Sequence, residues 1–503
     1  MSQHLIILPI LLPLIAGIVL LRTRAGSSRH KRLMSALATI LLIAVAVALT
    51  TTASSGEVTY YALGDWRPPF GIVLVLDRLS ALMVLLTAIL ALGCVIYACA
   101  GVDEEGSNFH GLFQLQLMGI NGAFLTGDLF NLFVFFEVLL LASYALLMHG
   151  GGKGRIQAGL HYVVLNLAGS SLFLIAVGVL YGATGTLNMA DMAVRLSDID
   201  PERTGLVRAG ALLLLVVFGL KAAILPLYFW LPRAYAAAPA PVAALFAIMT
   251  KVGIYAILRV YHLVFGDHAG SLSAPDQPWI WWLSLATLTM AATGVLAARD
   301  LRLLIAYLVL VSVGTLLAGI GMRTPDATQA LLYYLIHTTL VTGGLFLLAE
   351  MIGIQRGKAG TRLVKGRPMH HANLLAGLFF LGAVAIAGLP PLSGAIGKVL
   401  ILQSAGPDQQ LWLWPILLLS GLCALIALSR AGSTLFWRGQ DGTPGHTHVS
   451  RCQWFGVVWL LAASPLIVVF AGPINDYTAA TAEQLATPET HIRALLPDKG
   501  DES

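Results

Sequence analysis

The chain of 503 residues is 57% hydrophobic and only 11% charged, and its mean hydropathy of +0.82 excludes an ordinary water-soluble domain. The composition indicates a polytopic membrane protein. Its net charge of +5 comes from basic residues spread over short loops, with no Lys/Arg stripe interleaved with aromatic residues, so we expect no nucleic-acid partner.

Apolar stretches of about 20 residues, the length needed to cross a bilayer, follow one another along the chain. Fourteen such stretches are separated by short polar loops. The sequence therefore predicts an all-α polytopic membrane protein with about fourteen transmembrane helices. They lie near 4–22, 33–50, 78–100, 109–126, 129–148, 160–181, 209–231, 240–265, 279–297, 302–321, 328–352, 373–402, 411–435 and 454–472.

The loops predict the orientation of these spans. The first span is followed by a basic cluster and lacks a small-residue cleavage site, so we expect a retained helix and not a removed signal peptide. Because basic loops stay in the cytoplasm, the cluster places the N-terminus outside, and later basic loops on the same side place the C-terminus outside as well. The cluster consists of Arg22, Arg24, Arg29, Lys31 and Arg32.

Three segments are predicted to lie outside the membrane helices: an external hairpin at 52–77, a connection at 182–208 and a polar tail after Pro473. The four cysteines form no C-x-x-C pair, so we expect neither a metal site nor an iron–sulfur cluster. No phosphate-binding glycine motif follows a strand, so ATP-driven transport has no support.

Two spans contain proline in their interior, Pro226 in the seventh and Pro390 with Pro391 in the twelfth. Proline removes a backbone donor and clashes with the preceding turn, so both helices should break there. Each break has a lysine nearby, Lys221 or Lys398. Broken helices at membrane depth line a wet cavity or are buried in protein. The repeated pattern indicates a duplicated transport unit with inverted repeats.

Glu137 lies near the middle of NLFVFFEVLLLASYALL. A charge at the centre of a membrane helix costs about 2.5–3.5 kcal/mol, so it must be paired, hydrated or used. We expect a cation such as Lys221 to hold this carboxylate charged, and changes in that pairing to let Lys221 hold or release a proton. The alternatives are a purely structural ion pair for Glu137 and snorkelling to a headgroup for Lys221.

Lys251 and His337 are the next intramembrane candidates. Lys251 can exchange protons through ordered water, and His337 can pass a proton from one ring nitrogen to the other. A histidine on an apolar helix is equally often a hydrogen-bonded packing residue, so both readings of His337 remain open. Arg259, nearer the end of its span, is expected to snorkel or to pair at the surface.

Several runs resemble the D subunit of Mrp-type (also called Pha or Sha) cation/proton antiporters, over essentially the whole chain. That subunit is similar to the antiporter-like subunits of respiratory complex I and of membrane-bound hydrogenases. The runs that carry the resemblance are TGDLFNLFVFFEVLLLASYAL, GLHYVVLNLAGSSLFLIAVGVLYGATGTLNMADMA, GLKAAILPLYFWLPRAYAAAPAPVAALFAIMTKVGIYAILR and GLPPLSGAIGKVLIL.

The resemblance implies two inverted five-helix repeats with the seventh and twelfth helices broken. The first repeat would cover 109–265 and the second 279–435, preceded by helices and a hairpin at 1–108 and followed by a last helix and polar tail at 454–503. It assigns a proton gate to Glu137 and Lys221 and a proton relay to Lys251, His337 and Lys398. One departure is Thr342, where many relatives carry a lysine.

The function that the resemblance implies is proton translocation within a multisubunit Na⁺/H⁺ antiporter, with K⁺ or Li⁺ as further candidate ions. Such a protein is a secondary transporter and not an enzyme; it needs no cofactor, assembles with other Mrp-type subunits in the bacterial cytoplasmic membrane and serves pH homeostasis. Glu137 is the only deep acid, so a carboxylate-lined cation site is expected in another subunit. The alternatives are a proton-pumping subunit of a redox-driven complex and a purely scaffolding subunit.

Overall fold

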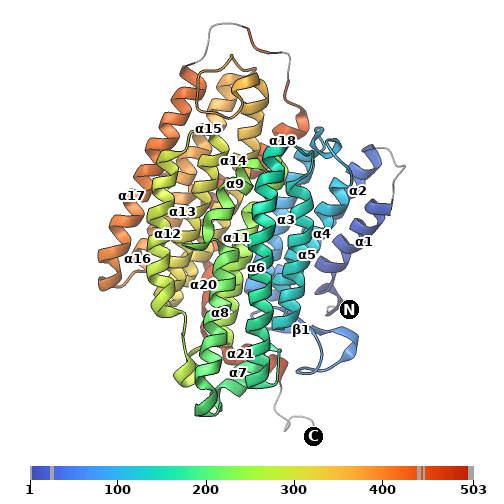
Figure 1. Ribbon diagram of the computed structural model, residues 1–503, viewed down its shortest axis with the longest axis vertical. Coiled ribbons are helices and arrows are strands. Elements are labelled where there is room, and N and C mark those ends of the chain that lie inside the picture. The colour runs from blue at the N-terminus through green and yellow to red at the C-terminus, as the bar shows by residue number, and fades with distance from the viewer. Residues whose placement is uncertain (1–2, 23–27, 439–442, 446–447, 497–503) are drawn as a thin grey trace.

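The computed structural model describes residues 3–22, 28–438, 443–445 and 448–496. Within these residues, eleven helical segments are long and apolar enough to cross a membrane, and three shorter apolar helices accompany them. This confirms the predicted all-α membrane fold (Figure 1). The fourth predicted span is the 17-residue helix α4 (Phe109–Leu125), whose buried face includes polar side chains: Gln114, Gln116 and Asn121.

The N-terminal part consists of helices and one hairpin. They are η1 (Gln3–Leu5), α1 (Leu8–Arg22), α2 (Ser28–Ala53), β1 (Thr59–Ala62), η2 (Leu63–Asp65), β2 (Val73–Leu76), α3 (Arg78–Ala98) and η3 (Val102–Glu104). The strands pair antiparallel, with Thr59 opposite Leu76 and Ala62 opposite Val73, so the predicted hairpin is confirmed.

The next helices reach from the fifth to the eighth predicted span. They are α5 (Leu129–Leu147), α6 (Lys153–Thr184), α7 (Met189–Ser197), η4 (Pro201–Arg203), α8 (Thr204–Ala222), η5 (Leu227–Phe229), α9 (Trp230–Ala237), α10 (Ala240–Leu245), η6 (Phe246–Ile248) and α11 (Met249–Leu263). The seventh span is broken as predicted. Helix α8 ends at Ala222, Ala223 adopts a left-handed conformation (φ 67°), and Pro226 lies in the connection before η5.

The remaining helices include the second broken span. They are η7 (Asp267–Leu272), α12 (Gln277–Ala297), α13 (Leu301–Met322), α14 (Pro325–Gln355), η8 (Gly357–Ala359), α15 (Ala372–Ala387), α16 (Ser393–Gln403), α17 (Pro407–Gly432), η9 (Ser433–Trp437), α18 (Arg451–Leu461) and α19 (Ala463–Val469). Pro390 and Pro391 lie between α15 and α16, so the predicted break of the twelfth span is confirmed.

The tail after the last span differs from the prediction of a polar, non-helical segment. It forms α20 (Ala471–Ala486) and α21 (Pro488–Leu495), which lie at the end of the molecule that carries the hairpin (Figure 1). The physical reason is periodicity, because four residues at helical spacing are buried on one face of α20. They are Thr478, Thr481, Ala482 and Leu485. The 182–208 connection likewise contains a helix, α7, which Asn188 caps at its start.

Helices α11 and α14 lie at the centre of the bundle. The most apolar parts of the span Ala240–Leu263 and of α14 are almost entirely buried, whereas those of α2 and α17 at the edge are only one-third buried. Lys251 on α11 and His337 on α14 are therefore enclosed by other helices instead of facing lipid. The proposed division into two repeats remains a prediction.

Candidate functional site

Glu137 projects from α5 toward α6. Its Oε1 accepts a hydrogen bond from the Ser170 hydroxyl, which also contacts the backbone oxygen of Asn166 at 3.0 Å. The glutamate is half-buried. Two polar side chains on α6 therefore stand next to Glu137, and neither was singled out from the sequence.

Lys221 lies in the last turn of α8 and is 5% exposed. Its ammonium donates to Asn166 Oδ1 at 3.3 Å, and the Asn166 backbone oxygen lies at 3.5 Å. Because the side chain points into the bundle, Lys221 does not snorkel. The C-terminal end of a helix carries partial negative charge, which stabilises a cation there.

Glu137 and Lys221 are connected through α6. No salt bridge joins them among the residues that the structure describes; instead, the hydrogen-bonded series runs from Glu137 to Ser170, Asn166 and Lys221. Two polar residues, Ser170 and Asn166, thus stand between the two members of the predicted gate. A small shift of α6 or α8 would change the distance between the Glu137 carboxylate and the Lys221 ammonium, and with it the energy of their electrostatic interaction.

Lys251 is fully buried on α11, and its ammonium donates to Ser312 Oγ on α13 at 3.4 Å. Gly253, two residues further on, lets the backbone of α11 lie directly against the end of α8, because a Cβ there would collide with the backbone of Ala222. This close packing places the helix of Lys251 beside the end of the helix that carries Lys221.

His337 is fully buried on α14 and bridges to the second broken span. Its Nδ1 lies 2.7 Å from Ser393 Oγ at the start of α16, and that hydroxyl lies 2.9 Å from Ser464 Oγ on α19. Its Nε2 has no hydrogen-bond partner. Both readings of His337, a packing residue and a group that exchanges a proton, therefore remain predictions.

Lys398 on α16 reaches back across the break. Its ammonium donates to the backbone oxygen of Ala387 at 2.8 Å and lies 3.4 Å from that of Ile386. These carbonyls belong to the last turn of α15 and have lost their helical partners. In both broken spans, therefore, a buried lysine sits at the C-terminal end of the first half-helix.

Four buried polar atoms near Lys251 and His337 have no protein partner. Buried polar groups are normally hydrogen-bonded, and where protein supplies no partner, ordered water does. Thr342 is one of these positions and keeps a polar group on the buried face of α14. The four atoms are Thr250 Oγ1, His337 Nε2, Thr338 Oγ1 and Thr342 Oγ1.

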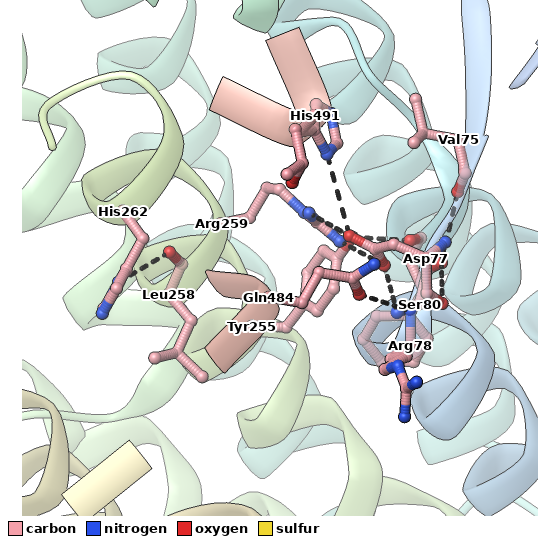
Figure 2. A network of polar contacts seen from close by, with 12 residues as sticks. Val75, Asp77, Arg78, Ser80, Tyr255, Leu258, Arg259, His262, Gln484 and His491 are labelled. Atoms are coloured by element: carbon pink, nitrogen blue, oxygen red, sulfur yellow. Dashed lines mark hydrogen bonds and ion pairs between the residues drawn. The ribbon is translucent and has the colours of Figure 1, made fainter. Parts of the chain in front are cut away.

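Arg259 is not at the surface, so the expectation of snorkelling or surface pairing is wrong. It is 4% exposed and forms a bidentate ion pair with Asp77, with oxygen–nitrogen distances of 2.5 and 2.8 Å. The reason is tertiary: β2 carries Asp77 to α11, where it also caps α3 by accepting from Ser80 N at 2.8 Å (Figure 2). Aspartate before an apolar run, with serine three residues on, was the available capping signal.

The C-terminal helix α21 covers this ion pair with His491, whose Nδ1 lies 3.8 Å from Asp77 Oδ2. Burial raises the pKa of the Asp77 carboxyl, but the Arg259 charge and hydrogen bonds outweigh it and hold that pKa well below the usual range. Burial, and then the Arg259 charge, lower the pKa of His491 to about 4. At neutral pH the pair is charged and His491 is neutral.

Acidification should therefore loosen the C-terminal helices. Between about pH 6.5, the ordinary value for histidine, and pH 5, the undocked tail binds a proton at His491 that the docked tail does not, which costs about 2 kcal/mol. Asp77 adds nothing in this window, because its carboxyl is ionised in both states until the pH falls below about 4. Amide hydrogen exchange of residues 478–495 at pH 7 and 5, corrected for intrinsic rates, measures the effect. His491→Gln should remove most of the acid-induced increase in exchange. An equal increase in the wild type and in His491→Gln would show that His491 is not the group responsible.

A protein-family model described as NADH:quinone oxidoreductase/Mrp antiporter, TM, matches residues 126–423. This segment is more than half of the chain and contains all five candidate proton-carrying residues. The chain belongs to the NADH:quinone oxidoreductase/Mrp antiporter family. The residues in the matched segment are Glu137, Lys221, Lys251, His337 and Lys398.

Named members of the Mrp antiporter family match along nearly the whole chain. The chain is 43% identical over 530 residues to the D subunit of a probable K⁺/H⁺ antiporter of Rhizobium meliloti, with 98% of each protein covered. It is 38% identical over 500 residues to the D subunit of a Na⁺/H⁺ antiporter of Bacillus subtilis, with 99% of this chain and all of the relative covered. The resemblance predicted from sequence is confirmed.

Solved structures of the family share the fold. A chain in the Mrp complex from Dietzia sp. superimposes with a TM-score of 0.87 at 26% identity, covering 98% of this chain and all of that one. A chain of the archaeal membrane-bound sulfane sulfur reductase gives 0.89 at 26% identity with the same coverage. Both neighbours come from membrane complexes, which supports a hetero-oligomeric setting for this antiporter protein.

Proposed function

We propose that this chain is the proton-translocating subunit of a multisubunit monovalent cation/proton antiporter. The observation that carries the proposal is the series of buried titratable side chains arranged on two broken helices and the helices packed against them. The relatives that match along nearly the full length support it, because they are named as Na⁺/H⁺ or K⁺/H⁺ antiporter subunits. The cation transported with this chain is proposed to be Na⁺, with K⁺ as the second candidate.

In the proposed mechanism Glu137 and Lys221 form the gate. Protonation of Glu137 removes the negative charge that helps stabilise the Lys221 ammonium, and Asn166 and Ser170 transmit or interrupt that influence as the helices shift. Lys221 then passes a proton on. The relay continues through Lys251, His337 and Lys398, with water at the orphaned polar atoms filling the intervals.

The proposed orientation places the basic loops in the cytoplasm of a bacterium and both termini outside the inner membrane. The hairpin, α7 and the terminal helices α20 and α21 then share the outer end (Figure 1). The partners are other Mrp-type membrane subunits, and a carboxylate-lined site for the exported cation belongs to one of them, because Glu137 is the only acid among the residues of the proposed gate and relay.

A redox-driven proton pump is the alternative, since the fold is shared with a chain of the sulfane sulfur reductase. Purification of the complex distinguishes the two. Small hydrophobic partners without flavin or iron–sulfur proteins indicate an antiporter, whereas co-purifying redox subunits would indicate the alternative.

Glu137→Gln is expected to reduce antiport to near background. The amide keeps the shape and can still accept from Ser170, but it cannot take up a proton or act on Lys221 by charge. Cation-driven collapse of a pH gradient in everted vesicles that contain the assembled complex measures the loss, which should be about 10²-fold or more.

The matched control is Glu350→Gln. Glu350 lies near the end of α14, 3.6 Å from Arg302, and is outside the proposed path. It should retain nearly normal antiport. A scaffolding role for the protein predicts instead that both variants transport normally, and that result would refute the gate.

A further inference from the structure

A polar stripe on α11 leads from the relay lysine toward the outer end of the molecule. Lys251, Tyr255 and Arg259 follow one another at intervals of four residues, so their side chains lie on one face of the helix. All three are buried. Tyr255 and Arg259 are not part of the gate or relay described above, although Lys251 is.

The stripe is continuous in hydrogen bonds at its outer part. Arg259 Nε donates to Tyr255 OH at 3.2 Å, while the tyrosine hydroxyl donates to the Phe124 backbone oxygen at 2.5 Å. The Arg259–Asp77 ion pair lies beyond it, and His491 of α21 points at that pair (Figure 2). The Nε2 of His491 is buried without a partner.

A small cavity of about 10 Å³ adjoins the ion pair. That is the space of a single water molecule, and the orphaned His491 Nε2 supplies a polar partner for one. The lining residues include Asp77, Arg259, His262, Leu485, Pro488 and His491.

A larger cavity of about 440 Å³ lies next to the small one, lined by residues of η7, the start of α14 and the C-terminal helices. The two cavities share three lining residues, His262, Leu485 and Pro488, which lie between them and are here called the neck. The larger cavity is polar: its lining includes Asp267, His268, Arg323 and Glu489. Arg259, which lines the small cavity, donates to Tyr255 and so links that cavity to the stripe.

We propose that this arrangement is a second water path, by which Lys251 exchanges protons with the outer face, closed in this conformation by the Asp77–Arg259 pair and α21. The inference rests on the proposed function, since it needs Lys251 to carry protons. It adds a route by which protons reach Lys251 from the outer face, within the half of the protein that contains the first broken span. This route is separate from the series that ends at Lys398.

The groups along the path have distinct tasks. Water carries the proton through the neck to the cavity beside Asp77 and His491, and the Tyr255 hydroxyl passes it toward the neutral amine of Lys251, which becomes the ammonium. Arg259 stays charged. While its guanidinium is in bidentate contact with the Asp77 carboxylate, the two groups leave no gap for a water molecule between them, so the pair must part for transfer. His491 and α21 restrict that parting, because they cover the carboxylate.

Cysteine labelling at the neck tests access. In the assembled complex in proteoliposomes, Leu485→Cys should react with a membrane-impermeant, positively charged methanethiosulfonate applied to the outer face, and antiport should fall about tenfold or more because the adduct fills the neck. Thr490→Cys, exposed on α21 away from both cavities, should label without loss. Failure of Leu485→Cys to label, or labelling with full transport retained, would overturn the proposal.

Tyr255→Phe tests the link to Lys251 while preserving the aromatic ring. Turnover should fall about tenfold. Tyr261→Phe is a matched control, because Tyr261 is a buried tyrosine of the same helix whose hydroxyl donates to a backbone oxygen, that of Ala211 at 2.6 Å, but lies off the stripe. Normal turnover in Tyr255→Phe would overturn the path. If Tyr255→Phe turned over normally while Lys221→Ala was inactive in the same preparation, the second water path would be wrong but the proposed function would stand.

Discussion

Lys221→Ala is expected to abolish antiport by the purified complex in proteoliposomes, with cation-dependent proton flux reduced about 10²-fold or more. Lys221 is the buried amine next to the break of the seventh span, bound to Asn166 and linked through α6 to Glu137. Alanine removes both the charge and the exchangeable proton. No other cation stands at this end of α8 to replace them among the residues that the structure describes.

Lys221→Arg separates charge from proton release. Arginine keeps the positive charge but holds its proton at any working pH, so the gate should remain closed and flux should stay near background. Lys358→Ala, in the exposed connection after α14, should behave as the wild-type complex. Normal flux in Lys221→Arg would mean that Lys221 serves only as a fixed charge, and the proposed gate would be wrong.

Gly394→Ala is expected to be nearly as damaging, through geometry alone. A Cβ at this position in the first turn of α16 would collide with the Ala385 backbone oxygen and come within 2.8 Å of His337 Nε2. Helix α16 must then move away, which separates Ser393 from His337 and displaces Lys398 from the end of α15. Overpacking of this kind costs about 1–3 kcal/mol, and the relay loses alignment in addition.

Two measurements check this expectation: the thermal stability of the purified complex and its antiport rate. Gly377→Ala is the control, because a Cβ on that residue of α15 meets open space. It should leave both quantities unchanged. Normal antiport in Gly394→Ala would show that the approach of α16 to His337 is not needed for transport.

Much of the fold could be predicted because hydropathy is a strong signal over long apolar stretches. The breaks at Pro226 and at Pro390 with Pro391 followed from the chemistry of a single residue type. The principal site residues could also be named, since a lysine or glutamate within a span is rare and expensive. Lys221 and Lys398 could be named as candidate proton carriers without any knowledge of how the helices pack.

The polar residues between the charged ones could not be predicted. Asn166, Ser170, Ser393 and Ser464 are small, common side chains whose importance depends on which helices meet. The Asp77–Arg259 pair joins positions separated by 182 residues, and no local sequence pattern predicts a contact over such a separation. The tail was misjudged because its helices are short and weakly apolar, and the face that α20 buries is defined only where α14 and α3 pack against it.

The C-terminal helices also impose an order on biosynthesis. Tyr477 OH donates to the Arg78 backbone oxygen, and Gln484 Oε1 accepts from the Arg78 backbone nitrogen across 406 residues. These contacts cannot form until nearly all of the polypeptide has left the ribosome. Arg78 at the start of α3 therefore lacks these two contacts until synthesis of the chain is nearly complete. We expect truncation before Ala471 to yield a protein that inserts all of its spans yet leaves the Asp77–Arg259 pair exposed to bulk water.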